Sequence, residues 1–276
     1  MIRYIRKASG EKEPFDIQKF KHSLLKIGAP EQLITKIVKE IELMPAMRTT
    51  RQLYDFALER LQENNPPLAA RYNIKRALME LGPTGFPFEQ FIALIFKEQG
   101  YSTQTDQIGR GACVDHELDI IARKESKHLM IECKFHNRQG IKSDVKVTLY
   151  VKARFDDIAK GWNNNPKDTD KFHGAWIVTN TRFTSQAIQY AQCAQIQLLD
   201  WSYPVDNNLP HLIKKLQLHP ITALTALSRQ QKRAFIKNKL ILCRDIPHRT
   251  ELLKKLGFPE HTIKKICEEA AAICEQ

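Results

Sequence analysis

The chain has 276 residues, of which 42% are hydrophobic and 27% charged, a composition typical of a globular protein with more than one core. Its 43 Lys and Arg residues outnumber its 31 Asp and Glu residues, and the formal net charge of +12 favours a polyanionic partner such as nucleic acid. No stretch is apolar enough for a membrane span and the N-terminus lacks the apolar core of a signal peptide, so we expect a cytoplasmic protein without a membrane partner.

Residues 1–85 are expected to form the first domain, a short β-hairpin followed by four helices. The hairpin spans residues 3–15 and turns at Ser9-Gly10. Asp16 and the Thr49-Thr50 pair precede apolar residues at helical spacing, so they are predicted to cap the first and third helices. Proline-containing breaks separate the helices, and the fourth helix is expected to run to Gly82-Pro83.

Residues 86–203 are expected to form a second domain that mixes helices and strands. A helix from Phe88 to about residue 99 is followed by short strands at residues 117–122, 128–135 and 174–180. A further helix is predicted around residues 145–158, and Thr184 is placed to cap another. A last strand at residues 196–201 closes what should be a three-layer α/β domain.

Residues 204–276 are expected to form a small C-terminal helical domain whose role the sequence does not reveal. Lysines dominate its polar faces. Its residues 252–270 are similar to residues 24–42, since both read helix, Gly, any residue, Pro, Glu, helix. The similarity indicates either an internal duplication or two independent helix corners that converge on one pattern.

Three residues on two neighbouring strands form a candidate metal site. Side chains alternate along a strand, so Glu132 and Lys134 share a face and Cys133 points away. Asp119 lies thirteen positions before Glu132, and a hairpin between the two strands can bring the carboxylates together. Two carboxylates suit a hard cation such as Mg²⁺, beside which a lysine can orient an attacking water. The alternative is an exposed polar strand face with a cross-strand ion pair.

A run of segments through this domain resembles the Mrr-like restriction endonucleases of the PD-(D/E)-x-K superfamily. The first helix of the domain matches at residues 88–101, and a glycine-containing loop with the strand after it matches at 109–122. The strand of the Glu-Cys-Lys motif matches at 128–135. The last strand-and-helix segment matches at 176–191, and its closing strand at 196–201. The resemblance implies a restriction-endonuclease-like α/β/α fold around a mixed sheet.

The resemblance also implies the roles of individual residues. Asp119 matches the first metal-binding acid, Glu132 the second, Lys134 the catalytic lysine, and Glu89 an acid often contributed by the first helix. The backbone carbonyl of Cys133 would be a further metal ligand. The implied chemistry is hydrolysis of a DNA phosphodiester with Mg²⁺ or Mn²⁺, leaving a 5′-phosphate. Many Mrr-like proteins have Gln where this chain has Glu132, which is a departure toward the broader superfamily.

The helix that follows the site carries cations that could contact DNA. Lys152, Arg154 and Lys160 are interleaved with aromatic residues, a pattern suited to gripping a phosphate backbone. An amphipathic helix that packs its aromatics inward and solvates its cations explains the pattern equally well.

The hairpin and first helices resemble an ATP-cone, a nucleotide-sensing module. The resemblance implies that ATP or dATP binds as an allosteric ligand, and its cationic, acidic and third-helix positions are Arg6, Lys7, Glu13, Asp16, Lys19, Thr50 and Tyr54. The turn departs from the usual Lys-Arg-Asp-Gly, because Arg6-Lys7-Ala8-Ser9-Gly10 adds a residue. No Walker-type loop is present, so we expect nucleotide binding without motor hydrolysis.

These observations predict a Mg²⁺-dependent endodeoxyribonuclease of restriction or defence type, regulated by adenine nucleotide. Two alternatives stay open at this point: a nucleotide-responsive DNA-binding regulator that does not cleave, and a repair or recombination nuclease acting on branched DNA. Double-strand cleavage needs two active sites, which favours a homodimer or higher homo-oligomer.

Overall fold

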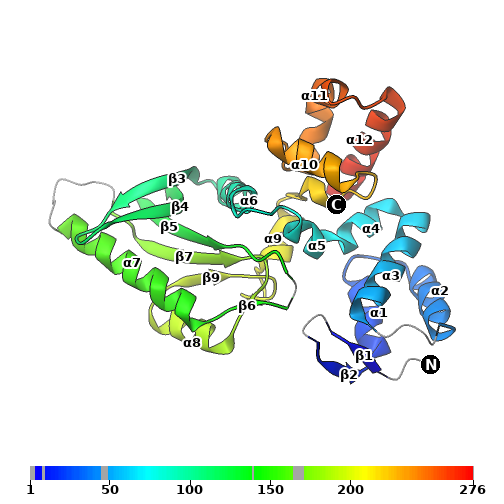
Figure 1. Cartoon of the computed structure of the whole chain (residues 1–276), viewed down its shortest axis with the longest axis horizontal. Helices are drawn as coiled ribbons and strands as arrows, with labels where there is room; N and C mark the ends of the chain where they lie inside the picture. Colours follow the sequence, from blue (N-terminus) through cyan, green and yellow to red (C-terminus); the bar gives the residue numbers. More distant parts are fainter. Residues whose placement is uncertain (1–3, 8–9, 45–48, 139, 164–170, 276) are drawn as a thin grey trace. The chain divides into compact units, whose positions relative to one another are not determined.

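The computed structural model describes residues 4–7, 10–44, 49–138, 140–163 and 171–275 (Figure 1). The chain forms two compact units, of which one combines Met1–Ala77 with His219–Gln276 and the other comprises Leu78–Leu218. The division into three domains at residues 85 and 203 stays a prediction. Among the helices that the structure describes, none has the length and apolar character needed to cross a membrane.

The predicted N-terminal hairpin is present. Strands β1 (Tyr4–Arg6) and β2 (Lys12–Pro14) pair antiparallel. Ile5, the middle residue of β1, is buried in the core of this unit. Ser9, predicted in the turn, lies outside the described residues. A parallel bridge between Arg6 and Thr49 attaches the hairpin to the beginning of helix α3.

Among the described residues from 15 to 79, the helices are α1 (Ile17–Leu25), α2 (Glu31–Glu42), α3 (Thr50–Asn64), α4 (Pro66–Tyr72) and α5 (Ile74–Met79). The predicted caps are confirmed. The Asp16 carboxylate accepts hydrogen bonds from the backbone N–H groups of Gln18 and Lys19. Thr49 and Gln52 form a reciprocal capping box that satisfies the first free N–H groups of α3.

The fourth predicted helix is divided in two at Asn73. The Asn73 side chain is buried, accepts a hydrogen bond from the Tyr54 hydroxyl at 2.7 Å, and donates one to the carbonyl of Ala223 at 3.3 Å. These partners lie far away in the sequence, so the apolar spacing of α4 and α5 could not reveal the break. Asn73 thereby joins the N-terminal helices to the C-terminal segment.

The C-terminal segment consists of short helices: η1 (Ile221–Ala223), α10 (Arg229–Lys237), η2 (Cys243–Arg249), α11 (Thr250–Lys255) and α12 (Glu260–Cys274). Their apolar faces share one core with Ala70 and Ala77 of α4 and α5, in which Phe235 and Ile266 are fully buried. Residues from both ends of the chain therefore stabilise the same unit.

The two similar segments of this unit adopt the same helix corner. Gly28 and Gly257 have φ of 81° and 83°, a left-handed conformation that glycine adopts without steric cost. Pro30 and Pro259 then begin the next helix in an extended conformation. The shared geometry is compatible with duplication and with convergence alike.

Substitution of Glu269 tests how the C-terminal segment is held. The buried Glu269 carboxylate accepts hydrogen bonds from the Thr225 N–H and hydroxyl, both at 2.7 Å, and from the Ala226 N–H at 3.1 Å. We expect Glu269→Gln to lower the free energy of unfolding by about 2 kcal/mol, because buried donors lose a charged acceptor. Glu268→Gln, at the exposed neighbouring position, should change it by less than about 0.5 kcal/mol.

Denaturant unfolding measures the difference, and hydrogen exchange locates it. The amide protons of Thr225 and Ala226 should exchange faster in Glu269→Gln than in Glu268→Gln. Equal exchange in the two variants would contradict the assigned role of this carboxylate.

The second unit is built on a five-stranded sheet with strand order β3-β4-β5-β7-β9. The strands are β3 (Ser102–Arg110), β4 (Asp115–Lys124), β5 (Lys127–Lys134), β7 (Gly174–Thr179) and β9 (Gln197–Leu199). The first three pair antiparallel and the last three parallel, so the predicted mixed α/β sheet is confirmed. A small parallel pair, β6 (Lys142–Ser143) and β8 (Arg182–Phe183), lies outside the main sheet.

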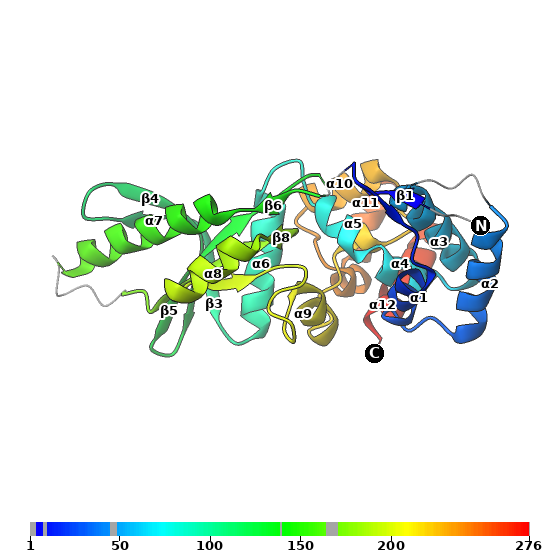
Figure 2. The ribbon, with the colours of Figure 1, turned by 90° about the horizontal axis from the view of Figure 1, so that it is seen from below.

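Helices cover both faces of the sheet. Helix α6 (Phe86–Glu98) lies on one face, where Phe96 contacts the ring of Trp176 edge-on. Helices α7 (Val145–Asn163) and α8 (Ser185–Cys193) lie side by side on the other face, where they share a core with Met130 and Ile177 (Figures 1 and 2). A further helix, α9 (Leu209–Lys215), ends this unit.

Strand β3 was not predicted. Its side chains alternate between exposed and half-buried and none is fully buried, so its sequence lacks the apolar run that marks a strand. It pairs with β4 alone and forms one edge of the sheet. Polar side chains on an edge strand discourage pairing with another chain.

Candidate active site

The candidate site lies where strands β4 and β5 separate. Their pairing runs from Lys124 opposite Lys127 to Ile120 opposite Ile131. At the next position, Asp119 accepts a hydrogen bond through its side-chain Oδ2 from the backbone N–H of Cys133 at 2.7 Å. The Asp119 carboxylate is therefore held directly against the strand that carries Glu132 and Lys134.

Glu132 forms a buried ion pair with Arg154 of helix α7. The guanidinium Nη1 lies 2.6 Å from the carboxylate Oε2, and the side chains are only 8% and 11% exposed for Arg154 and Glu132. Burial and the neighbouring Asp119 charge raise the pKa of Glu132, while Arg154 and Lys134 lower it. The sequence predicted Arg154 as a DNA contact on the surface. The structure instead places it inside the site, because α7 turns this residue toward the sheet.

The ionisation of Glu89 of helix α6 is affected by the charges of nearby acids. Together, Glu89, Asp106, Asp119 and Glu132 are called the electrostatic cluster. Burial and the charges of Asp119, Asp106 and Glu132 raise its pKa to about 7. Asp119 is also shifted, since burial raises its pKa and the hydrogen bond from Cys133 and the charge of Arg154 partly offset this. Like charges in one partly buried place make each carboxyl harder to ionise.

Asp106 is an acid of this cluster that the sequence analysis missed. It lies on the unpredicted strand β3 and has φ of 56°, a left-handed conformation that Asp tolerates better than most residues. No motif marks it, so only the pairing of β3 with β4 could have located it.

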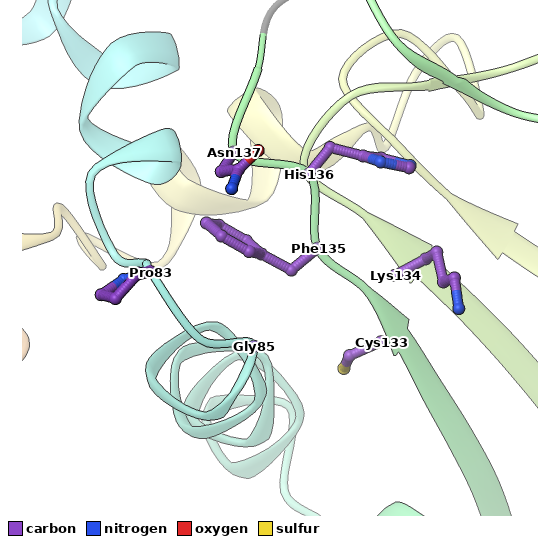
Figure 3. A pocket seen from close by; sticks show the side chains of 7 residues that line it. All are labelled: Pro83, Gly85, Cys133, Lys134, Phe135, His136 and Asn137. Atoms are coloured by element: carbon purple, nitrogen blue, oxygen red, sulfur yellow. The ribbon is translucent and has the colours of Figure 1, made fainter.

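Lys134 is the last residue of β5, and its side chain is exposed. The buried Thr179 hydroxyl donates a hydrogen bond to the Lys134 carbonyl at 2.7 Å, which ties the end of β5 to β7. Figure 3 shows the Lys134 side chain on the opposite side of the strand from those of Cys133 and Phe135. This is the alternation that the sequence predicted for the motif.

A cavity of about 320 Å³ opens beside Lys134 (Figure 3). It is lined by Pro83, Gly85 and the residues from Cys133 to Asn137. Its wall is fixed by Asn180, which accepts a hydrogen bond from the His136 N–H and donates one to the His136 carbonyl, both at 2.8 Å. Burial lowers the pKa of the His136 imidazole, and the Lys134 charge lowers it further.

The loop before β4 is held by Asp157 of helix α7. Its carboxylate accepts hydrogen bonds from the N–H groups of Cys113 and Val114 and contacts His116 at 2.8 Å. The hydrogen bond with His116 and those from Cys113 lower the pKa of Asp157 to about 2. A Cβ on Gly111 would lie 2.1 Å from Asp157 Oδ2, so only glycine fits this loop.

Comparison with known proteins adds the family. Residues 83–202 match the family model described as restriction endonuclease, and residues 219–274 match the model described as AF1548-like, C-terminal. An uncharacterized protein of Archaeoglobus fulgidus is 32% identical over 183 residues, which are 66% of this chain and 99% of that protein.

The chain belongs to the AF1548-like family. The crystal structure of the protein of unknown function AF1548 superposes with a TM-score of 0.57 at 31% sequence identity, covering 69% of this chain and 98% of that chain. Within the AF1548-like chain, the site described above lies in the segment that matches the restriction endonuclease model, a nuclease domain of the PD-(D/E)-x-K superfamily.

The donor atoms at this site fit a hard divalent cation. Within the described residues, no three His, Cys, Asp or Glu side chains are arranged to hold a metal ion together. Mg²⁺ does not need three such side chains, since it keeps several waters and uses one or two carboxylates. Asp119 and Glu132 would supply oxygen ligands, and the backbone carbonyl of Cys133, which follows Glu132 on β5, would be a third candidate.

Several residues predicted to bind nucleotide gather at the N-terminal hairpin. The ammonium of Lys7, which follows β1, lies 2.6 Å from the carboxylate of Glu13 in β2. Arg6 pairs with Thr49 and so lies next to Thr50 at the beginning of α3. Asp16 and Lys19 follow on α1, where Asp16 serves as the helix cap and the Lys19 side chain is exposed.

Tyr54 lies further along α3, where it contacts residues of α4 and the residue that follows α4. Its hydroxyl donates to Asn73, and its ring stacks on Tyr72 with centroids 5.0 Å apart.

The other two predicted DNA contacts lie on α7, where Lys160 is exposed and Lys152 forms an ion pair with Asp156.

Glu89 makes the stability of the metal-free protein depend on pH. Folding raises its pKa to about 7, so the stability it contributes is present below about pH 4.5 and is lost as the pH rises through 7. The full pKa shift corresponds to a change of about 3 kcal/mol in the free energy of unfolding. Because this side chain is only half-buried, screening by solvent reduces that change to about 1 kcal/mol.

We therefore expect Glu89→Gln to stabilise the protein in EDTA at pH 8 and to have no effect at pH 4.5. Denaturant unfolding at the two pH values measures the difference. Asp206→Asn, which removes an exposed carboxylate from a loop of the same unit, should show no such dependence. A pH-independent effect of Glu89→Gln would contradict the electrostatic cluster.

Proposed function

We propose that this protein is a Mg²⁺- or Mn²⁺-dependent DNA endonuclease of restriction or defence type. One observation carries the proposal. Asp119 contacts the strand of Glu132 and Lys134 directly, at the point where two strands separate, within a segment that matches the restriction endonuclease family. A strand face that served only as polar surface would not need a buried carboxylate, Glu132, next to the half-buried one of Asp119.

Each residue of the site has a role in this proposal. Asp119, Glu132 and the Cys133 carbonyl would hold the cation, which when bound supplies water activation and charge stabilisation. Lys134 orients the attacking water and neutralises charge on the phosphate. Glu89 of helix α6, whose ionisation responds to the charges of Asp119 and Glu132, can accept the proton that the water gives up. The water oxygen bonds to phosphorus, the bond from phosphorus to the 3′ oxygen breaks, and the 3′ oxygen takes a proton from solvent, so that a 5′-phosphate and a 3′-hydroxyl result.

The DNA would lie along helix α7 and the cavity beside Lys134. Lys152 and Lys160 can contact backbone phosphates, which would position the duplex without reading its sequence. Cutting both strands requires a second active site, so we propose that the enzyme acts as a homodimer or higher homo-oligomer.

Cleavage of plasmid DNA tests the proposed activity. With Mg²⁺ or Mn²⁺ the protein should nick or cut the plasmid, and Lys134→Ala should reduce the rate at least about a hundredfold while leaving DNA binding intact. Lys127→Ala, at the exposed opposite end of β5, is the matched control and should cut normally. Unmodified, methylated and branched substrates in parallel would separate restriction from repair.

Two results would count against this assignment. Undiminished cutting by Lys134→Ala would remove the lysine from the site. DNA binding without cutting on any substrate would favour a DNA-binding regulator that has this fold.

We also propose that ATP or dATP binds at the N-terminal hairpin and regulates cleavage. The support comes from residues that lie close together at the hairpin. Arg6 ends strand β1 and Lys7 follows it directly, and the bridge from Arg6 to Thr49 brings the polar start of α3 beside Arg6. Cationic side chains of this kind neutralise a triphosphate, and short polar groups can bind ribose or base.

Isothermal titration with ATP and dATP tests this site. We expect a saturable signal for at least one nucleotide, reduced about tenfold or more in affinity by Arg6→Ala because a charge-assisted contact is lost. Lys36→Ala, on the exposed face of α2, should bind as the unaltered protein does. Absence of heat at millimolar nucleotide would refute the proposal and leave the nuclease assignment unaffected.

A further inference from the structure

Arg154 is the most deeply buried charged partner of the proposed active site. Its guanidinium lies 2.6 Å from Glu132 Oε2, and both side chains are about nine-tenths buried. The contact joins helix α7 to strand β5 across 22 residues of sequence. A charge in such a position is costly unless it is paired and hydrogen-bonded, and Glu132 meets both conditions for Arg154.

The packing of α7 dictates where Arg154 points. Val151 and Ile158 are three residues before and four residues after Arg154, so the three residues share one face of the helix. Val151 and Ile158 are buried in the core between α7 and the sheet. The guanidinium is consequently fixed over the sheet by a rigid helix and does not depend on a mobile loop.

The guanidinium is also held from a second side. The ring of Tyr150, one helical turn earlier, lies 5.3 Å from the Arg154 carbon Cζ, within the range of a cation–π contact. A planar guanidinium can contact a ring with its face and a carboxylate with its edge at the same time, which an ammonium cannot do. The pair of contacts restrains the Glu132 carboxylate to one orientation.

We propose that Arg154 is a positioning residue that orients Glu132 as a ligand for the divalent cation. The proposal rests on the proposed nuclease function. Arg154 binds Oε2 of Glu132 and would keep this carboxylate oriented to hold the cation together with Asp119. Carboxylates that ligate metals are commonly oriented by such outer hydrogen-bond partners, whose removal weakens metal binding about ten- to a hundredfold. Arg154 does not contact DNA in this arrangement.

The test is the affinity for Mn²⁺, measured by isothermal titration on the full chain without DNA. Arg154→Gln should bind Mn²⁺ at least about tenfold more weakly than the unaltered protein. Arg154→Lys should fall between the two, because one donor is kept and the planar geometry is lost. Lys146→Gln removes the same charge from an exposed position of α7 and should leave the affinity unchanged.

Circular dichroism first establishes that each variant is folded. If Arg154→Gln fails to fold, Arg154→Lys decides the question. A Mn²⁺ affinity within twofold of that of Lys146→Gln, in whichever Arg154 variant is folded, would overturn the positioning role. Failure of the unaltered protein to bind Mn²⁺ would refute the proposed metal-dependent nuclease itself, so the two failures are distinguishable.

Discussion

The neighbouring carboxylates of Glu132, which is buried, and Asp119, which is half-buried, dictate how the rest of this unit is built. Burial raises the pKa of both carboxyls, and the charge of Asp119 raises the pKa of Glu132 further. The protein compensates with the Cys133 N–H on one side and the Arg154 guanidinium on the other. These contacts compensate only in part, because burial, which raises the pKa, remains the largest influence on the pKa of both carboxyls. A divalent cation would complete it, which is why the arrangement favours metal binding over a purely structural role.

The architecture around the carboxylates serves to hold them together. The antiparallel pairing of β4 with β5 ends at Ile120, the residue next to Asp119. The Asp119 carboxylate is therefore free to accept a hydrogen bond from the backbone of β5. Thr179 and Asn180 of the β7 end fix the carbonyls of Lys134 and His136. Helix α7 contributes at two points, through Arg154 to Glu132 and through Asp157 to the loop before β4.

Much of the fold was predictable because local signals determine it. The caps at Asp16 and Thr49 and the mixed sheet followed from capping residues and apolar spacing. Features that depend on contacts distant in sequence were missed. Strand β3 carries no apolar run, the break at Asn73 depends on Tyr54 and Ala223, and the burial of Arg154 depends on the rotation of α7. Of the site, the sequence predicted the proximity of Asp119 to the motif strand but neither Asp106 nor the partner of Glu132.

The central claim is that the paired carboxylates form a cation site for phosphodiester hydrolysis. Anomalous scattering from crystals of the Lys134→Ala variant grown with Mn²⁺ and duplex DNA tests it most directly. We expect an anomalous peak in contact with Asp119, Glu132 and the Cys133 carbonyl, with a backbone phosphate beside it. Bound DNA with no anomalous peak at either carboxylate would contradict it.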